Sequence, residues 1–534
     1  MKKYFLIALA ALGFAACENE MENATQEQQN GELEQSYVAV SLMADDMTTR
    51  TRATGDVYDD GDASERIVKS LYFFLFDEAG QPFAIDGNKN YKAVAVNEEG
   101  NAPGATAPEG TPNVSDVKDK VLVFENYKGE YPSKIVAVLN WAPAADAAYS
   151  LDALADQLSG LRNADNAFVM SNAVYVSESS NATAKKEAIR ATALSEANIA
   201  KSAADAKANP VQIYVERIAA KVTVNTTAEN KYDIGEDING AKVYAKVTGW
   251  DLYNEYEQSY LLKKVDPTWT GTSVGFTWND PAWFRSYWAI SPTTPFDAEG
   301  NKVSYNSLTN TVGGNDYCGE NTYNTNCTKV IVKALLIGED NQPVEVATWY
   351  GNDYVGELAL RTVVANTLAS QLYYMDGTEY KSIEPGHLMV VEANEPNPNT
   401  SADMEAYHVF FQLSTDGEAK EWYTYSAAEG FKVSTKEAVN VILGGVEPAL
   451  LYKGGQTYYY TDIKHLPSTV DETKYGVVRN HVYKVNITSV DGFGTPVYDG
   501  NTAFDPEKPQ DVTTYVSAEV RVLSWRVVEN NYDI

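Results

Sequence analysis

The sequence predicts an all-β protein, built of β-sandwich domains with long loops and short helical inserts. The chain is rich in Tyr, with 36 of them in 534 residues, and in the β-branched residues Val and Thr. Runs with an apolar residue at every second position are frequent, whereas helical periods are few. Its 35 Gly and 20 Pro punctuate these runs with turns. The length leaves room for two or three domains.

The last strand is the clearest element of the pattern. Residues 515–528 alternate apolar and polar side chains, and the apolar set changes face after Val522, which indicates a bulge or a change of packing partner. Few residues follow this strand, so we expect it to be free to pair with any open groove, including a groove of another molecule. Its expected inward side chains are Val516, Ala518, Val520 and Val522, followed by Leu523 and Trp525.

A second alternating strand lies near the start, with Val38, Val40 and Leu42 directed inward. The small, polar residues 48–56 follow it and predict an exposed, cleavable loop. Cutting after Arg50 or Arg52 would release the first strand and open a groove that the last strand of another copy could fill. The alternative is that both are ordinary terminal strands of a monomer.

The first residues have the features of an export signal. Two lysines precede a short apolar run over residues 4–16, which is too short to span a bilayer. Residues 14–17 form a loose lipobox with Phe where Leu is usual, so we expect Cys17 to be acylated and to become the new N-terminus. The alternative is an ordinary signal peptide that ends near a cysteine. Residues 18–35 then form a polar tether.

Between the two terminal strands, the pattern predicts further strands and little helix. Leucines at 151, 154, 158 and 161 predict one short helix, and residues 182–208 predict a helical or flexible insert. Residues 77–120 are expected to form a loop. A domain boundary is expected near residue 228. Strands are expected at 67–76, 134–141, 211–224, 241–252, 284–290, 330–336, 388–392, 407–413, 456–463 and 482–490.

Charge and motifs argue against several function classes. The net charge of −32 repels phosphate, which excludes nucleic acid as a partner. The aspartates between residues 56 and 62 lack the spacing of a calcium loop and predict a solvated loop instead. No nucleotide-binding or nucleophile motif is present, so we expect neither an enzyme, nor a metal, nor a cofactor. The four histidines share no ligand spacing: His387, His408, His465 and His481.

Two further groups of residues leave alternatives open. Cys318 and Cys327 could close a disulfide in an exported protein, or remain two free thiols. Aromatic residues such as Trp283, Trp288 and Tyr458 to Tyr460 could stack on sugars, although strand aromatics are more often core residues. Together with the lipid signal, they suggest a cell-surface glycan-binding lipoprotein as the alternative function.

Several segments resemble one family. The C-terminal runs 476–487, 492–496 and 520–525 are similar to segments of the fimbrilins of Bacteroidales type V pili. The runs 215–222 and 317–322 resemble that family too, in the same order along the chain. The nearest group is the shaft subunits of the short, minor fimbriae of Porphyromonas.

This resemblance implies two transthyretin-like β-sandwich domains and a structural role in a cell-surface fimbria that supports adhesion and biofilm formation. It implies an outer-membrane lipoprotein precursor with palmitate at Cys17, cut by an arginine-specific protease at Arg52–Ala53, with Arg50 as the alternative. Strand exchange would then join copies of the chain and accessory subunits, in a shaft, tip or anchor role. The expected segments are 1–17 signal, 18–52 removed tether and strand, 53–228 and 229–511 domains, and 512–534 donor region.

Overall fold

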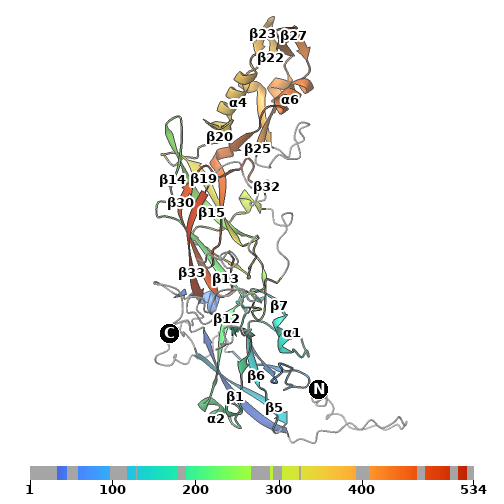
Figure 1. Ribbon diagram of the computed structural model, residues 1–534, viewed down its shortest axis with the longest axis vertical. Helices are drawn as coiled ribbons and strands as arrows, with labels where there is room; N and C mark the ends of the chain where they lie inside the picture. Colours follow the sequence, from blue (N-terminus) through green and yellow to red (C-terminus); the bar gives the residue numbers. More distant parts are fainter. Residues whose placement is uncertain are drawn as a thin grey trace, which may run out of the picture.

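The computed structural model describes most of the chain as an elongated molecule with three successive bodies (Figure 1). The N-terminal domain lies at one end, a middle sandwich follows, and a distal lobe forms the other end. Within the described residues, no helix is long and apolar enough to cross a membrane. The described residues are 33–44, 58–59, 61–96, 117–127, 129–176, 188–265, 289–292, 303–323, 326–392, 408–465, 476–504 and 515–525.

The N-terminal domain is built on one mixed sheet with its own apolar core. Short helices, α1 (Leu151–Ala155) and α2 (Ala203–Ala208), lie beside it. A separate pair, β9 (Tyr175–Val176) with β10 (Ala188–Ile189), completes this domain. In order across the sheet, the strands are β4 (Tyr91–Ala93), β3 (Leu71–Phe76), β6 (Lys134–Leu139), β8 (Met170–Asn172), β12 (Val211–Arg217), β1 (Leu33–Ala44) and β5 (Val117–Tyr127), with β11 (Thr192–Ala193) also on β6.

The middle body is a sandwich of two sheets that enclose a second core. One sheet runs β18 (Asn315–Cys318), β13 (Ala220–Asn225), β30 (His481–Asp491), β33 (Tyr515–Trp525) and β2 (Tyr58–Asp59). The facing sheet runs β14 (Tyr232–Ile238), β15 (Ala241–Tyr253), β19 (Lys329–Ile337), β29 (Gln456–Asp462) and β31 (Thr495–Pro496). Small pairs flank it: β7 (Leu158–Gly160) with β16 (Gln258–Tyr260), and β17 (Val303–Ser304) with β32 (Ala503–Phe504).

The distal lobe has a third core and two small sheets. Helix α4 (Gly356–Leu368) buries Leu360, Val364 and Leu368 along one face. Helix α6 (Lys436–Gly444) is capped by Thr435, whose hydroxyl accepts from the Ala438 amide. A one-turn helix, α5 (Thr415–Glu418), lies between them in sequence. The sheets are β21 (Asn352–Val355), β20 (Val346–Trp349), β28 (Ala449–Tyr452), β25 (His408–Leu413) and β24 (Leu388–Glu392), and β23 (Glu379–Ser382), β22 (Leu372–Asp376), β26 (Trp422–Ser426) and β27 (Gly430–Ser434).

The expected fold class is confirmed, because the described chain is mostly strand in several sheets. The expected boundary near residue 228 is too late. Strand β12 belongs to the N-terminal sheet and β13 to the middle sheet, so the chain changes body at Ile218 and Ala219. Both residues are buried in the N-terminal core, whereas Ala220 is buried in the middle core. The unbroken apolar pattern over residues 211–224 hides this change.

Residues 229–511, expected to form one sandwich, contain two separate buried cores. Residues 346–452 leave the middle sandwich after β19 and form the distal lobe before the chain returns as β29. Helices α4 and α6 of this lobe were not expected from the sequence, and α4 is the longer of the two. Its buried positions mix Leu, Val and Ala, and Gly356, at φ 80°, begins it without a side-chain cap.

Local predictions differ in length from the structure. The strand expected at 67–76 begins at Leu71, and the helix expected from residue 151 ends at Ala155, because Leu158 pairs in β7. The expected loop at 77–120 contains β4 and the start of β5. The insert at 182–208 contains short strands and α2. The strand expected at 284–290 lies almost entirely outside the described residues.

Candidate functional site: the two terminal strands

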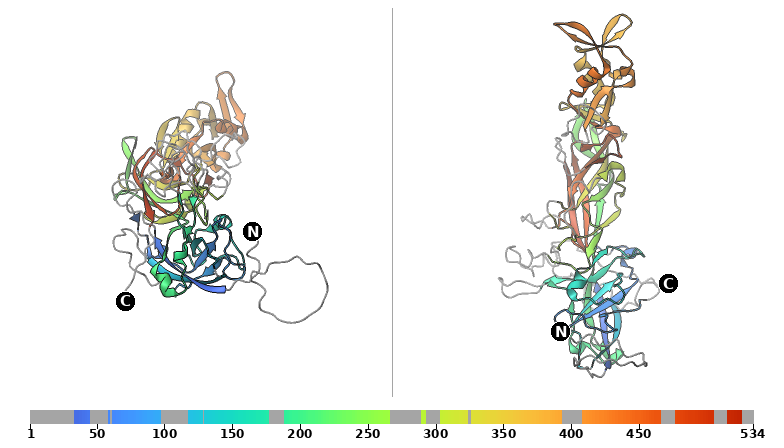
Figure 2. Two further views of the ribbon diagram at one scale, coloured as in Figure 1. Left: turned by 60° about the horizontal axis from the view of Figure 1, so that its bottom comes forward. Right: turned by 90° about the vertical axis from the view of Figure 1, so that its right-hand side faces the viewer.

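Strand β1 lies inside the N-terminal sheet rather than at its edge. It pairs antiparallel with β5 from Leu33 to Met43, and parallel with β12 from Val40 to Ala44. Figure 2 (right) shows β1 in blue and β5 in cyan in the lower domain, where the two strands pair. Because both of its edges are hydrogen-bonded, β1 joins two parts of the sheet that would otherwise present unpaired edges.

The side chains of β1 alternate as the sequence predicts. Val38 and Val40 have no exposed surface, and Leu42 is 3% exposed, all three within the N-terminal core. The Ser36 hydroxyl donates to Asn126 Oδ1 at 2.6 Å, and the Tyr37 backbone exchanges two hydrogen bonds with Ala200. Buried apolar surface and a two-sided ladder therefore hold this strand. Its displacement from the sheet stays a prediction.

Strand β33 is paired within its own chain. It lies antiparallel to β30, from Asp491 opposite Tyr515 to His481 opposite Ser524, with a register shift between Ile487 and Ser489. Within a single chain the last strand therefore has a partner, and its availability to another copy stays a prediction. The sequence shows a good strand but not its partner, and β30 offers an edge of matching length close by.

The two terminal strands occupy different sheets. Strand β1 completes the N-terminal sheet, whereas β33 completes a sheet of the middle sandwich. They therefore do not compete for one place within a single molecule. Competition for the β1 position could arise only between the β1 of one copy and the β33 of another.

A short strand links the two sites. Strand β2 pairs parallel with the end of β33, placing Tyr58 opposite Ser524 and Asp59 opposite Trp525. In sequence, β2 follows residues 45–57, which connect it to β1 and contain both candidate arginines. A cut at either arginine would separate β1 from β2, so β2 and everything after it would stay in the remaining chain.

The segment after β2 is anchored at the junction between the first two bodies. The one-turn 3₁₀ helix η1 (Ala63–Arg66) places Glu65 there, completely buried. The backbone carbonyl of Glu65 accepts hydrogen bonds from Nε and a terminal nitrogen of Arg217, at 3.0 and 2.9 Å. The amide of Arg217 donates to Asn480 Oδ1 at 3.2 Å, which ties this junction to the start of β30.

The carboxylate of Glu65 is the electrostatic centre of this anchor. Lys221 Nζ lies 2.9 Å from Oε1, and the Tyr317 hydroxyl donates to the same oxygen. Burial raises the pKa of Glu65, but the hydrogen bonds from Tyr317 and Lys221 outweigh it, so the pKa lies below its ordinary value. A buried charge with these partners fixes the position of η1. The sequence shows Arg217 and Lys221 as charged residues within the strand pattern of residues 211–224, but it does not show that Glu65 is their partner.

Several residues expected in the site lie outside the described residues. These include the lipidation residue Cys17, the cleavage residues Arg52 and Ala53, and the alternative Arg50. The side chains of β33 are not described either, so only its backbone pairing is known here. The lipid, the cut and the donor side chains therefore stay predictions.

The two remaining cysteines are buried and are not joined by a disulfide in the structure. Cys318 ends β18, and Cys327 precedes β19. Burial raises the pKa of the Cys318 thiol well above its ordinary value, which keeps the sulfur protonated and poorly nucleophilic. Of the two open alternatives, the structure therefore has the one without a disulfide.

The histidines are built into the packing. His387 stacks edge-on to Trp422, and His465 shares a 2.7 Å hydrogen bond with the Tyr483 hydroxyl. The rings of His465 and His481 lie 5.2 Å apart. Among the residues that the structure describes, no cluster of His, Cys, Asp or Glu could hold a metal ion.

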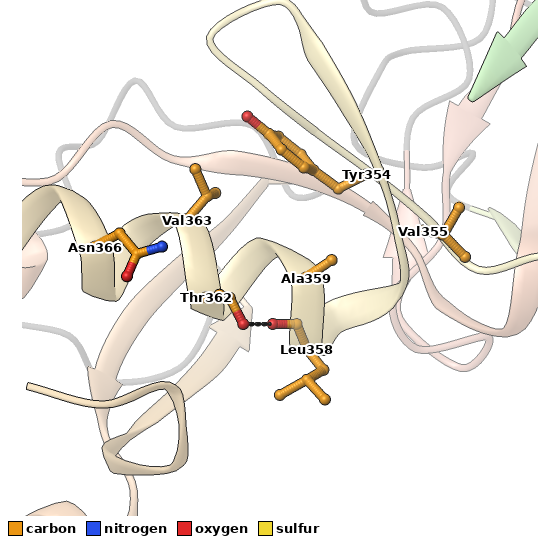
Figure 3. Close-up of a pocket in the computed structure, with 7 residues that line it drawn as sticks. All are labelled: Tyr354, Val355, Leu358, Ala359, Thr362, Val363 and Asn366. Atoms are coloured by element: carbon orange, nitrogen blue, oxygen red, sulfur yellow. Dashed lines mark hydrogen bonds between the residues drawn. The ribbon is translucent and has the colours of Figure 1, made fainter. Parts of the chain in front are cut away.

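A hollow of about 550 Å³ lies on the distal lobe between β21 and α4 (Figure 3). Figure 3 shows Thr362 turned back onto its own helix, where its hydroxyl donates to the Leu358 carbonyl at 2.7 Å. Its lining carries no carboxylate, imidazole, amine or thiol, and its polar side chains are the hydroxyls of Tyr354 and Thr362 and the amide of Asn366. It is lined by Tyr354, Val355, Leu358, Ala359, Thr362, Val363 and Asn366.

The aromatic residues expected to stack on sugars are mostly unsuited to it. Tyr458 and Tyr459 are buried, at 2% and 4% exposure, and only Tyr460 of that run is exposed. Trp283 and Trp288 lie outside the described residues. Strand aromatics here therefore serve mainly as core residues.

A comparison with protein-family models matches the C-terminal part of the chain. Residues 450–531 match the family model described as major fimbrial subunit protein type IV, fimbrillin, C-terminal. This segment contains β29, β30 and β33, and so includes the pair that holds the last strand. No curated protein matches the chain.

Solved structures match over most of the chain at low identity. A fimbrilin (FimA) of Porphyromonas gingivalis has 14% identity and a TM-score of 0.37, over 92% of this chain and 98% of that one. The tip fimbrial protein Mfa3 of the same species has 12% identity and a TM-score of 0.30, over 92% and 100%. A fimbrial assembly protein of Parabacteroides distasonis has 11% identity and a TM-score of 0.27, over 76% and 100%.

Proposed function

We propose that this chain is a structural subunit of a cell-surface fimbria, without enzymatic activity, which polymerises by exchange of terminal strands. The observation that carries the proposal is the position of β1, an inner strand held on both edges and joined to the rest of the chain by one segment, residues 45–57. Removing it would leave a slot between β5 and β12. The match of residues 450–531 to the fimbrillin model supports the same conclusion.

The donor in this proposal is β33 of a neighbouring copy. Its 11 residues come close to the 12 of β1, and both strands alternate apolar with polar residues. The inward set of the donor is expected to be Val516, Ala518, Val520 and Val522, followed by Leu523 and Trp525. Leaving its own sheet costs β33 its long pairing with β30 and its two-residue pairing with β2, and insertion beside β5 and β12 gives it a long ladder on one edge and a further ladder on the other. The exchange is therefore driven by the longer ladder on the second edge and by apolar burial in the slot.

The proposed processing is the one expected from the N-terminal residues. The precursor is exported, acylated with palmitate at Cys17 and held at the outer membrane until an arginine-specific protease cuts at Arg52–Ala53, or after Arg50. The anchored segment from β2 through Glu65 stays in place after the cut, so only β1 and its tether are lost. The remaining subunit then joins copies of itself and accessory fimbrial subunits at the cell surface.

The test is the Arg50→Ala/Arg52→Ala double variant, compared with Arg190→Ala, which removes only an exposed ion pair with Asp152. Cells are sheared and the released material is run unheated in detergent gels. We expect the wild type and Arg190→Ala to give ladders of multimers that collapse on heating, and the double variant to stay cell-bound and monomeric. A ladder from the double variant, or sheared material whose N-terminus lies upstream of Tyr37, would refute the proposal.

A further inference from the structure

The exposed apolar side chains of the described residues gather at one end of the molecule. Nine of the fourteen large apolar side chains exposed to solvent belong to the distal lobe, which is about a fifth of the chain. Part of this set lies on the two hairpins β22–β23 and β26–β27, which Figure 2 (right) shows at the free end of the lobe. Concentrated exposure of this kind marks an interaction surface.

One face of the hairpin sheet is aromatic. Strand register places Tyr373 opposite Tyr423, and Tyr425 opposite Phe431, so their side chains leave the sheet on the same side, with Tyr380 from β23 joining them. We call these five residues the aromatic face. The other side of the same strands is occupied by core residues, which are Leu372, Tyr374 and Trp422. The sheet therefore has a packed side and an aromatic side turned to solvent.

The rings of the aromatic face hold one another in place. Tyr380 and Phe431 stack at 3.8 Å between centroids with planes 5° apart, and Tyr373 meets Phe431 edge-on at 5.0 Å. Tyr423 lies edge-on to Tyr380 at 4.9 Å. Tyr380, Tyr425 and Phe431 nevertheless stay 39–41% exposed. A partner therefore meets a preformed aromatic surface, and the rings of this surface lose little rotamer entropy when it binds.

The hydroxyl groups of this face are unused by the protein. Within the described part of the chain, none of the four tyrosine hydroxyls takes part in a hydrogen bond with a protein atom. Each tyrosine thus offers a ring face beside a free donor and acceptor. A purely apolar protein surface would cover these hydroxyls without satisfying them, which costs free energy. A partner that alternates C–H and O–H groups could stack on the ring faces and also form hydrogen bonds with the tyrosine hydroxyls.

The charges around the aromatic face limit which class of polymer can bind it. The lysines of the two hairpins already have carboxylate partners: Lys381 pairs with Asp376, and Lys432 lies 2.6 Å from Glu429. Both lysines of these hairpins are thus paired with carboxylates, and the net charge of −32 disfavours an anionic polymer as the partner. Pyranose rings present C–H faces and hydroxyl edges without charge. We propose that the aromatic face binds a neutral polysaccharide.

The test uses the full secreted chain in native gels that contain mannan, dextran or laminarin, with heparin as the anionic comparison. Tyr380→Ala/Phe431→Ala removes the stacked rings, and Tyr380→Phe/Tyr425→Phe keeps the rings but removes two hydroxyls. Tyr350→Ala is the matched control, because Tyr350 is 67% exposed on the same lobe but lies outside the aromatic face. Dissociation constants come from retardation against polysaccharide concentration.

We expect at least one neutral polysaccharide to retard the wild type and the control equally. The alanine pair should weaken binding about tenfold or more, and the phenylalanine pair by a few fold, which also answers the question if the alanine pair fails to fold. Retardation by heparin alone, by no probe at all, or to the same extent in every variant would overturn the proposal. So would self-association through this face. Binding does not require polymerisation, so this test is independent of the proposed function.

Discussion

The strongest prediction concerns two leucines of β1, which are chemically identical but differ in burial. Leu42 is 3% exposed inside the N-terminal core, whereas Leu33, at the other end of the same strand, is 50% exposed. Both pair with β5. Replacing each with Ala removes the same atoms, so the difference between the two variants measures what burial of β1 contributes.

The magnitudes separate the two cases. Leu42→Ala should lower the free energy of unfolding of the N-terminal domain by about 2–5 kcal/mol, because it removes buried apolar surface and leaves a cavity. Leu33→Ala should change it by about 0.5 kcal/mol or less. Burial of Val38, Val40 and Leu42 together is worth about 5–9 kcal/mol. Since a whole domain is stable by about 5–15 kcal/mol, the N-terminal domain cannot lose β1 without a replacement.

Hydrogen exchange followed by mass spectrometry is the assay, read from peptides covering β5 and β12. Because about 1.4 kcal/mol corresponds to a factor of ten, Leu42→Ala should speed exchange there by roughly 30-fold or more. After a cut that removes residues 1–52, both variants have the wild-type sequence and must behave identically. Equal exchange rates in the two uncut variants would refute the claim that β1 holds this sheet together.

Three further predictions concern single groups. Burial, with neighbouring carboxylates second, raises the pKa of Glu255 to about 8. Between about pH 4.5 and 8 the Glu255 carboxyl is ionised in the unfolded chain but protonated in the folded protein. The free energy of unfolding therefore falls as pH rises through that window. Glu255→Gln should match the wild type near pH 4 and exceed it at pH 8 in urea titrations, whereas the exposed control Glu229→Gln should not. Arg479→Met should cost about 3–5 kcal/mol in the same titration, because it strands buried Glu320, 2.7 Å from the guanidinium. The Cys318 thiol should resist iodoacetamide at pH 8 until urea unfolds the chain, and modification of the native protein would contradict its burial.

Much of the strand content could be predicted from the sequence. Period-two alternation fixed the inward faces of β1 and placed β19, β24, β25, β29 and β30 within a residue or two. This pattern is local, since the alternation within each strand indicates which of its faces is buried. The neighbour with which a strand pairs is not indicated by local sequence. Nothing in residues 515–525 states that β30 is their neighbour, and the sequence left the last strand free for that reason.

The boundaries between the three bodies and the burial of Glu65 were harder to predict from the sequence. The chain crosses from the N-terminal domain to the middle sandwich at Ile218 and Ala219 without Gly or Pro, because both residues are buried and no polar turn is needed. The distal lobe returns to the middle sandwich over a hundred residues later, so only the tertiary structure separates the two. The burial of Glu65 could not be predicted from the sequence either. A carboxylate in a polar stretch predicts an exposed side chain, yet Lys221 and Arg217, far along the chain, contact Glu65.

The most direct measurement is an electron cryomicroscopy structure of the sheared, assembled fibre at a resolution that traces the backbone. The account predicts that residues 515–525 of one subunit lie between β5 and β12 of the next, where β1 lies in the closed chain, and that the edge of β30 in the donor subunit is vacated. Density for β1 still between β5 and β12, with β33 still paired to β30 of its own subunit, would contradict strand exchange as the mechanism of assembly.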